Sequence, residues 1–319
     1  MMNNQKKSPS DNGSGRVAVK EIRFAFFGTP HLATVFLDDL EKSGLVPSLV
    51  VTTPDAPQGR GKVLASPPIK EWAESRGIRT VQPETLDDDF AEQLSAAVWD
   101  VFVVIYYGKI LPKGMLEIPK RGTLNIHFSL LPRWRGTSPV RAAIANDDGE
   151  IGTSIILLDE QIDHGPVIAQ KRIAMLQPDG GWPPSASDAE ETATHESARL
   201  LAQVMPAWIS GEIEAREQNH DLATHCPAYT KDDGLLDLYG DAYKNLLKIR
   251  AFDSTVGTHS FFERGGKRLR VQILKAHLDG DPSTSLGASK LVIDRVKPEG
   301  KREMSYEEFL RSGAKPLKE

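Results

Sequence analysis

Apolar and polar positions follow two different periods along the first two thirds of the chain. Ile22–Phe27, Leu49–Thr53 and Val101–Ile105 are short apolar runs, and each of them predicts a buried strand. Between the first two runs, apolar residues recur at helical spacing from Leu32 to Leu40 and stop near Gly44. A strand, a helix and a second strand in this order make a βαβ unit, whose crossover requires a parallel sheet.

The same alternation continues to about residue 205. It predicts helices over 69–76, 87–97, 138–146 and 187–205, and strands over 122–126, 153–158 and 167–174. Pro206 is expected to kink or end the last helix, because proline removes a backbone donor and its ring clashes with the preceding turn. Beyond a polar stretch without periodicity, one helix (242–251) precedes short alternating strands over 259–262, 269–275 and 290–296, which is typical of a small β-barrel or sandwich.

We therefore predict an α/β fold, with a Rossmann-like sheet that contains parallel strands and is flanked by helices, followed by a small β domain. The predicted boundaries are a disordered tail over 1–20, a first domain over 21–210, a linker over 211–230 and a C-terminal domain over 231–319. The whole chain has 319 residues, which suits about two domains because a single core stops growing near 250 residues.

Composition narrows the class of protein. The longest unbroken apolar run, residues 101–107, is too short to cross a bilayer of about 30 Å as a helix, and the first twenty residues lack the apolar stretch of a secretory signal. The single cysteine, Cys226, excludes an internal disulfide framework and a cysteine-rich zinc site. These features predict a cytoplasmic protein without a membrane partner. Charge is uneven, since residues 231–319 carry 17 Lys and Arg against 14 Asp and Glu while the whole chain has a net charge of −5.

The candidate chemistry lies in the segment from Thr123 to Gly136. Asn125 and His127 are two residues apart at the carboxyl end of a predicted strand, so their side chains project from one face at the edge where open α/β sheets bind ligands. An amide can stabilise an oxyanion and an imidazole can move a proton, which suits acyl or formyl transfer. Asp163 lies in a turn-like segment that could orient the His127 ring and favour its protonated form. Each residue alone is more often structural, so the combination carries the hypothesis.

The sequence around these residues resembles the 10-formyltetrahydrofolate-dependent formyltransferases, and within them the methionyl-tRNA formyltransferases. The matching segments cover nearly the whole chain after the tail: FFGTP at 26–30, TTPDAPQGRGKVLASPPIK at 52–70, VVIYYGKILP at 103–112, LNIHFSLLPRWRG at 124–136, DEQIDHGP at 159–166 and RVKPEGKREMSYEEFL at 295–310. Tyr106 departs from the family pattern, which usually has a small residue there.

The resemblance implies a role for each matching residue. It makes Asn125, His127 and Asp163 the catalytic residues, and 10-formyltetrahydrofolate the donor, with no metal. It implies a folate site formed by Tyr106, Tyr107, Gly108, Ser129, Leu130, Leu131 and Pro132. It also implies an OB-like C-terminal domain and a monomer that binds initiator methionyl-tRNA through Arg60, Lys62, Arg264, Lys267 and Arg268.

Two alternatives stay open at this point. Enzymes that formylate amino sugar nucleotides share the Asn–His–Asp pattern and also extend beyond it, so the pattern alone does not choose the acceptor. A non-catalytic RNA-binding protein on a Rossmann-like scaffold is the other alternative. The turn Gly28-Thr29-Pro30 lacks the GxGxxG fingerprint, which argues against a dinucleotide-dependent dehydrogenase. The basic Gly59–Lys62 loop suits phosphate contact and favours a tRNA acceptor.

Overall fold

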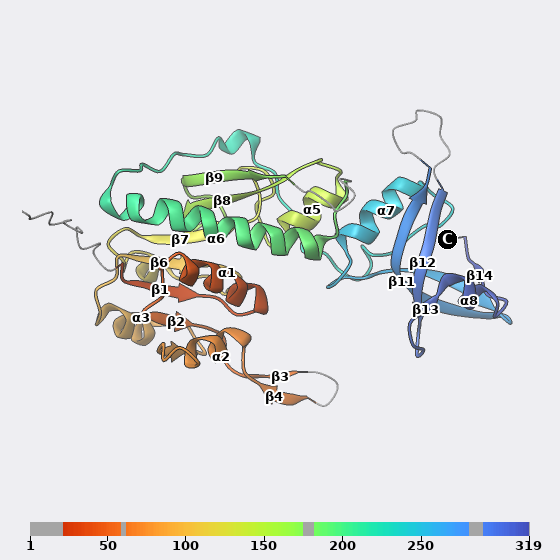
Figure 1. Ribbon diagram of the computed structural model, residues 1–319, viewed down its shortest axis with the longest axis horizontal. Coiled ribbons are helices and arrows are strands. Elements are labelled where there is room, and N and C mark those ends of the chain that lie inside the picture. Colours follow the sequence, from red (N-terminus) through yellow and green to blue (C-terminus); the bar gives the residue numbers. More distant parts are fainter. Residues whose placement is uncertain (1–21, 59–61, 175–181, 281–289, 319) are drawn as a thin grey trace, which may run out of the picture.

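A seven-stranded sheet forms the centre of the first body of the chain (Figure 1). The computed structural model describes residues 22–58, 62–174, 182–280 and 290–318. The strand order is β5-β2-β1-β6-β7-β8-β9, in which the first five strands are parallel and the last two are antiparallel. Their bounds are β1 (Phe24–Phe27), β2 (Leu49–Val51), β5 (Thr80–Val81), β6 (Val101–Val104), β7 (Thr123–His127), β8 (Ile151–Leu157) and β9 (Val167–Ile173). The predicted α/β class with a mostly parallel sheet is confirmed.

The order of strands creates a natural ligand-binding edge. The chain extends the sheet from β1 to β2 and β5 on one side, and then returns to add β6 and β7 on the other side. The direction of sheet growth therefore reverses between β1 and β6. In open α/β sheets, ligands bind outside the carboxyl ends of the strands at such a switch point.

Alternate residues of the strands build two apolar cores. Phe24 and Phe26 of β1 belong to one core, and Ala25 and Phe27 belong to the other, all fully buried. The first core is closed by α1 (His31–Lys42), α2 (Pro68–Glu74), α5 (Pro139–Ala145) and α6 (Ala186–Ser210). The second core is closed by α3 (Asp88–Ser95) and α4 (Lys113–Leu116). Period-two alternation therefore sends residues of one strand to opposite faces of the sheet.

Helix α6 continues past the proline that was expected to kink or end it. It runs from Ala186 to Ser210 with Pro206 inside the helix, so the predicted end near residue 205 is wrong. An interior proline costs about 3 kcal/mol. Contacts at the end of the helix offset this cost: Trp208 is 7% exposed, its indole Nε1 donates to the Arg121 carbonyl, and the Arg121 guanidinium donates back to the Trp208 carbonyl. The last turn is thus held by the body it packs against.

The second body is an antiparallel sheet with two helices. Its strands are β10 (Thr258–Arg264), β11 (Lys267–Asp279), β12 (Lys290–Pro298), β13 (Met304–Ser305) and β14 (Lys315–Pro316), in the order β13-β12-β11-β10-β14. Helices α7 (Ala242–Ala251) and α8 (Tyr306–Leu310) supply Ile249 and Phe309 to its core. Within the described residues, the edge strands β13 and β14 do not pair with each other, so the sheet is open rather than a closed barrel.

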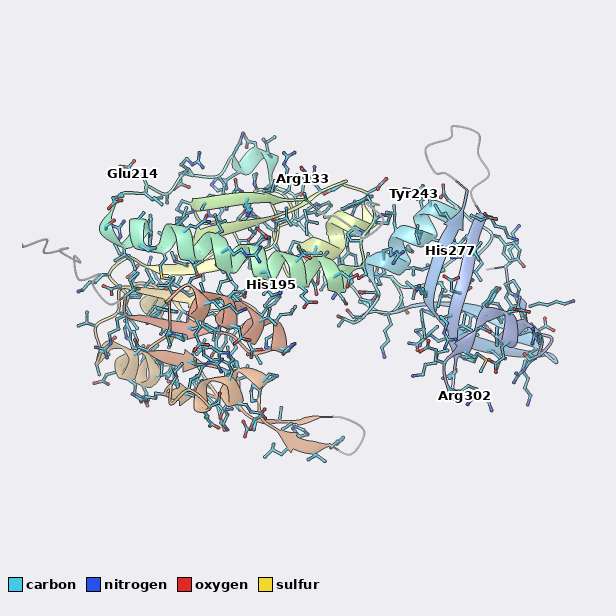
Figure 2. All side chains as sticks on the ribbon, in the orientation of Figure 1. Arg133, His195, Glu214, Tyr243, His277 and Arg302 are labelled. Carbon is cyan, nitrogen blue, oxygen red and sulfur yellow. The ribbon has the colours of Figure 1, made fainter. Side chains whose placement is uncertain are left out.

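Helices α5 and α7 join the two bodies. Arg141 of α5 is 7% exposed, and its guanidinium donates to the Ala251 carbonyl, to Ser254 and Thr255 beyond α7, and to Glu190 of α6. Figure 2 marks Tyr243 of α7 at the same junction, where its hydroxyl donates to Asp147 at 2.8 Å. No helix among the described residues has the length and apolar character needed to cross a membrane.

We predict that Arg141→Ala lowers the free energy of unfolding by about 3 kcal/mol, because it removes the buried guanidinium from four acceptors and leaves the half-buried Glu190 carboxyl without its cation. Urea denaturation measures this loss. Arg172→Ala serves as the control, since Arg172 pairs with Glu150 on the surface and its side chain is 72% exposed. The control should change the free energy by less than about 0.5 kcal/mol. Equal losses in both variants would contradict a special role for the junction.

Candidate active site

Strand β7 directs two polar side chains to one face of the sheet. Leu124, Ile126 and Phe128 belong to the first core, so Asn125 and His127 point to the opposite face. Both lie at the carboxyl end of β7, which pairs with β6 next to the switch point. Asn125 is half-buried, whereas His127 is only 5% exposed. The amide is therefore the more accessible of the two groups.

Asp163 reaches these side chains from the loop between β8 and β9. Its Oδ2 lies 3.4 Å from Nδ1 of His127, and its Oδ1 lies 3.5 Å from Nδ2 of Asn125. The backbone N–H of Gly136 donates to Oδ2 at 2.8 Å and fixes the carboxylate. The structure thus brings the three predicted catalytic residues together, from two separate stretches of chain.

The hydrogen bonds of His127 indicate which ring nitrogen carries a hydrogen. Its Nε2 lies 2.8 Å from the Trp134 carbonyl, which can only accept, so Nε2 carries a hydrogen. Burial lowers the pKa of His127 and outweighs the Asp163 carboxylate, which raises it as expected. At neutral pH the ring is therefore neutral, and Nδ1 faces the carboxylate with a lone pair. The imidazole and the carboxylate together form a preformed acceptor for a proton.

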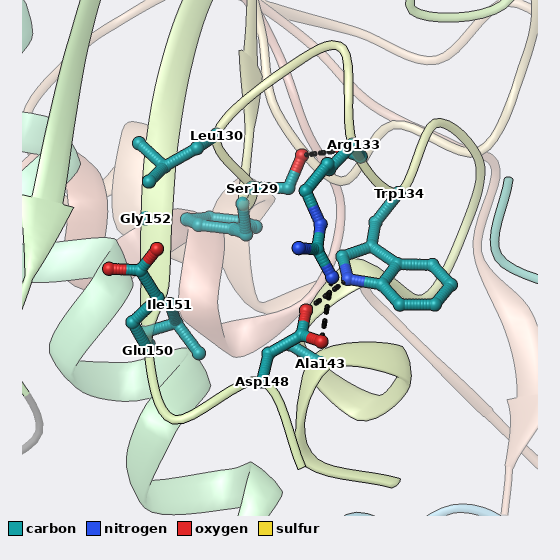
Figure 3. A pocket seen from close by; sticks show the side chains of 10 residues that line it. Ser129, Leu130, Arg133, Trp134, Ala143, Asp148, Glu150, Ile151 and Gly152 are labelled. Carbon is teal, nitrogen blue, oxygen red and sulfur yellow. Dashed lines mark hydrogen bonds and ion pairs between the residues drawn. The ribbon is translucent and has the colours of Figure 1, made fainter. Parts of the chain in front are cut away.

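The residues predicted to bind folate divide into several environments. Ser129 donates to the Arg133 carbonyl at 2.6 Å, and Leu131 packs against Ile156 and Val167. Ser129 and Leu130 line a small pocket with Arg133, Trp134 and Asp148, as Figure 3 shows; the remaining lining residues are Phe128, Ala143, Glu150, Ile151 and Gly152. Phe128, Ala143 and Ile151 belong to the first core. This pocket therefore opens on the face of the sheet opposite to Asn125 and His127.

The other predicted folate residues follow β6. Tyr106 has a φ of 53° and its ring stacks on Phe128 with centroids 5.0 Å apart, so it packs into the first core. Tyr107 is 3% exposed against Phe27, and burial raises its pKa to about 12. Gly108 has a φ of 77°, a conformation that favours glycine. Pro132 is half-buried after the buried Leu131, and its backbone carbonyl accepts from the Thr224 N–H.

The residues predicted to bind tRNA lie at two sites. Arg60 falls outside the described residues, whereas Lys62 is exposed beside a hairpin of β3 (Ala56–Gln58) and β4 (Val63–Ala65). Arg264 and Lys267 are exposed and flank the tight turn between β10 and β11. The Arg268 guanidinium lies over the Phe261 ring, 3.8 Å from its centroid. The hairpin projects from the first body toward the side where the second body lies (Figure 1).

Sequence reasoning missed two residues that complete the site. Gln218, from the stretch predicted as a linker, is 7% exposed and its amide donates to the Asp163 carbonyl at 2.9 Å. Arg135 is 6% exposed, and its guanidinium donates to the side-chain oxygen Oε1 of Gln218 at 2.7 Å. A glutamine in a polar stretch without periodicity gives no signal in one sequence. Over the described part of the chain, no group of three His, Cys, Asp or Glu side chains is placed to hold a metal.

Comparison with known proteins shows the family of the chain. Residues 21–194 match the family described as formyl transferase, and the chain belongs to this family. It is 40% identical to a methionyl-tRNA formyltransferase of Myxococcus xanthus, over 90% of this chain and 94% of that protein. It is 35% identical to the enzyme of the same name from Desulfotalea psychrophila, over 93% and 94%.

Solved structures share the fold at lower identity. An N-formyltransferase from Helicobacter canadensis, in complex with folinic acid and dTDP-3-aminofucose, is 17% identical with a TM-score of 0.59, covering 82% of this chain and 89% of that chain. A sugar N-formyltransferase from a Shewanella species is 15% identical with a TM-score of 0.56, covering 77% and 95%. These likenesses show the formyltransferase fold of the chain.

We predict that the His127 ring titrates below its ordinary pKa of about 6.5. Asp163→Asn should lower the pKa further, because it removes the negative charge that stabilises the imidazolium. NMR titration of the histidine rings measures both values, and the signal missing from His127→Ala assigns the ring. A midpoint above 6.5 in the unchanged protein, or a rise in Asp163→Asn, would show that burial is not the dominant effect.

Proposed function

We propose that the protein transfers the formyl group of 10-formyltetrahydrofolate to the α-amino group of methionine on initiator methionyl-tRNA. The observation that carries the proposal is the contact of Asn125, His127 and Asp163 at the carboxyl end of β7. The names of relatives that are 40% and 35% identical over most of the chain support the choice of acceptor. Within this proposal, residues 21–210 are the catalytic domain and 231–319 an OB-like tRNA-binding domain.

The first step needs a hydrogen-bond donor that stabilises negative charge. When the amine attacks the formyl carbon, its oxygen becomes an oxyanion. The half-buried amide of Asn125 supplies an N–H at the open side of the cluster, and its bond to Asp163 is long, at 3.5 Å. This leaves the amide free to donate to the oxyanion, which is a large source of rate enhancement in acyl transfer.

The second step needs a group that moves a proton from one nitrogen to another. The attacking amine becomes positively charged and must lose a proton, and N10 of the folate must gain one as its bond to the formyl carbon breaks. Nδ1 of His127 and Oδ2 of Asp163 face each other across 3.4 Å, so the two groups can share a proton. They accept the proton from the amine and return it to N10, so the transfer balances without another reactant.

The folate donor is held by the segments predicted for it. The backbone around Tyr106–Gly108 ends β6 beside the switch point, and Ser129–Pro132 follows His127. The ring of Tyr106 packs against Phe128 and leaves the backbone of this turn to face the donor. The tRNA is bound by Arg60, by Lys62 beside the hairpin of β3 and β4, and by Arg264, Lys267 and Arg268 of the second body.

A sugar nucleotide is the competing acceptor. The solved structures of similar fold include sugar N-formyltransferases, which supports this alternative, although they are less than 20% identical to the chain. Incubation of the protein with the folate donor and either acceptor separates the two. Acid gel electrophoresis should show formylated methionyl-tRNA, and no formylated amino sugar should form. The reverse outcome would reject tRNA as the acceptor.

We predict that His127→Ala lowers kcat by about 10²–10⁴-fold and Asn125→Ala by about 10²–10³-fold. Both should leave the Kd for methionyl-tRNA within about twofold, because neither side chain holds the RNA. His195→Ala is the matched control: His195 also pairs with an aspartate, Asp39, but it lies on α6. Its kcat should be unchanged. Retained turnover in His127→Ala would remove the basis of the mechanism.

Electrostatic contact with the phosphate backbone makes binding depend on salt. Arg268→Ala should reduce the slope of log Kobs against log salt by about 1, since one fewer counterion is released. Filter binding of methionyl-tRNA between 50 and 200 mM salt measures this slope. Arg199→Ala is the control, because Arg199 is an exposed arginine of α6 that pairs with Glu196 on the first body. A slope that changes equally in both variants would argue against a site on the second body.

A further inference from the structure

The segment after α6 runs along the candidate active site. We define residues 216–226, which include the short helix η1 (His220–Leu222), as the strap. At one end, Arg216 exchanges two backbone hydrogen bonds with Val167 of β9, at 2.7 and 2.8 Å. At the other end, the backbone N–H of Arg135 donates to the Thr224 carbonyl, and the backbone carbonyl of Arg135 accepts from the Cys226 N–H, both at 2.8 Å. The strap is therefore fixed to β9 at one end and to the loop after β7 at the other.

Gln218 lies in the middle of the strap and bonds to both loops. Its Nε2 donates to the carbonyls of Asp163 and Gly165, at 2.9 and 2.7 Å. Its Oε1 accepts from Nε and from a terminal nitrogen of Arg135, at 3.2 and 2.7 Å. Both amide hydrogens and both lone pairs of the side chain are thus used. The side chain is only 7% exposed, so water does not readily replace these bonds.

The loop that carries Asp163 has reasons to need such a brace. Asp163 has a φ of 49°, a left-handed conformation that a non-glycine residue rarely adopts and that costs free energy. At Gly165 an added Cβ would lie 1.9 Å from the Leu157 carbonyl, so the loop is pressed against the end of β8. Two carbonyls of this short loop point at one side chain, and without it they would lose their partner.

The distances between the three side chains make the site sensitive to the position of this loop. The carboxylate of Asp163 lies 3.4 Å from His127 and 3.5 Å from Asn125, at the outer limit of direct contact. A further shift of about 1 Å breaks both contacts, and misplacement on this scale can cost about 10²-fold in rate. The backbone of Asp163, which Gln218 holds, therefore decides whether the carboxylate can share a proton with His127.

We propose that Gln218 is a positioning residue for formyl transfer, which holds Asp163 against His127 by binding the backbone of the Asp163 loop and the guanidinium of Arg135 at once. This inference rests on the proposed catalytic role of Asp163. The side chain itself does not touch the reacting atoms. His220 of the strap supports the same loop, because its ring stacks on His164 with centroids 4.1 Å apart.

The test uses the full chain with Gln218→Ala and Gln218→Met, the second of which keeps the volume of the side chain and removes its hydrogen bonds. We expect kcat to fall by about 10–10²-fold in both variants, with KM for the folate donor and for methionyl-tRNA within about threefold. The matched control is Asn245→Ala, because Asn245 is also a buried amide, 7% exposed, whose Nδ2 donates to a backbone carbonyl, that of Asp237. It should lower Tm by a similar amount and keep kcat.

Two further measurements distinguish positioning from general stabilisation. The N–H of Gly136 bonds to the Asp163 carboxylate, so its hydrogen exchange should accelerate in the Gln218 variants at a temperature where all variants are folded. The NMR midpoint of His127 should also move down, as the carboxylate withdraws.

The possible results distinguish the role of Gln218 from the proposed function. Folded Gln218 variants with unchanged kcat, beside an inactive Asp163→Asn, would overturn the role of Gln218 and leave the proposed function intact. Full activity in Asp163→Asn would overturn the proposed function itself. A fall in kcat that Asn245→Ala reproduces at equal loss of Tm would mean that stability alone explains the effect, and would also overturn the inference.

Discussion

One buried carboxylate organises the candidate site. Asp163 accepts from the Gly136 backbone and lies within 3.5 Å of both Asn125 and His127, while burial keeps the imidazole neutral. A carboxylate and an unprotonated ring nitrogen that face each other can share one added proton. A reaction that releases a proton requires such an acceptor.

The fold produces this arrangement through two simple constraints. Reversal of strand order between β1 and β6 leaves the carboxyl ends of the neighbouring strands open, and alternation along β7 sends Asn125 and His127 away from the core that Leu124, Ile126 and Phe128 fill. The antiparallel turn from β8 to β9 then returns the chain to the same edge with Asp163. The end of β7 and the loop between β8 and β9 thus meet at one point, and Asp163 adopts a left-handed φ of 49° there.

The parts that follow from local pattern could be predicted from the sequence, and the parts that depend on distant packing could not. Apolar periodicity located six of the seven strands of the first sheet, missing the short β5, and most helices, and the Asn-x-His spacing with Asp163 located the cluster. The extension of α6 past Pro206 could not be predicted, because the mutual hydrogen bonds of Trp208 and Arg121 bring together residues 87 positions apart. Gln218 was hidden for the same reason: a polar stretch without periodicity indicates a linker, and its 55-residue separation from Asp163 is bridged only in three dimensions.

The strap also changes what counts as the boundary of the active unit. The family match ends at residue 194, and the first sheet with its last helix ends at Ser210, yet the side chain that braces the reactive loop comes later, on the way to the second body. A shortened chain that stops at the end of α6 would keep Asn125, His127 and Asp163 while losing the hydrogen bonds that Gln218 donates to the Asp163 loop. The connection between the two bodies thus supports the loop that carries Asp163, and exchange of the second body between relatives would have to carry this stretch along.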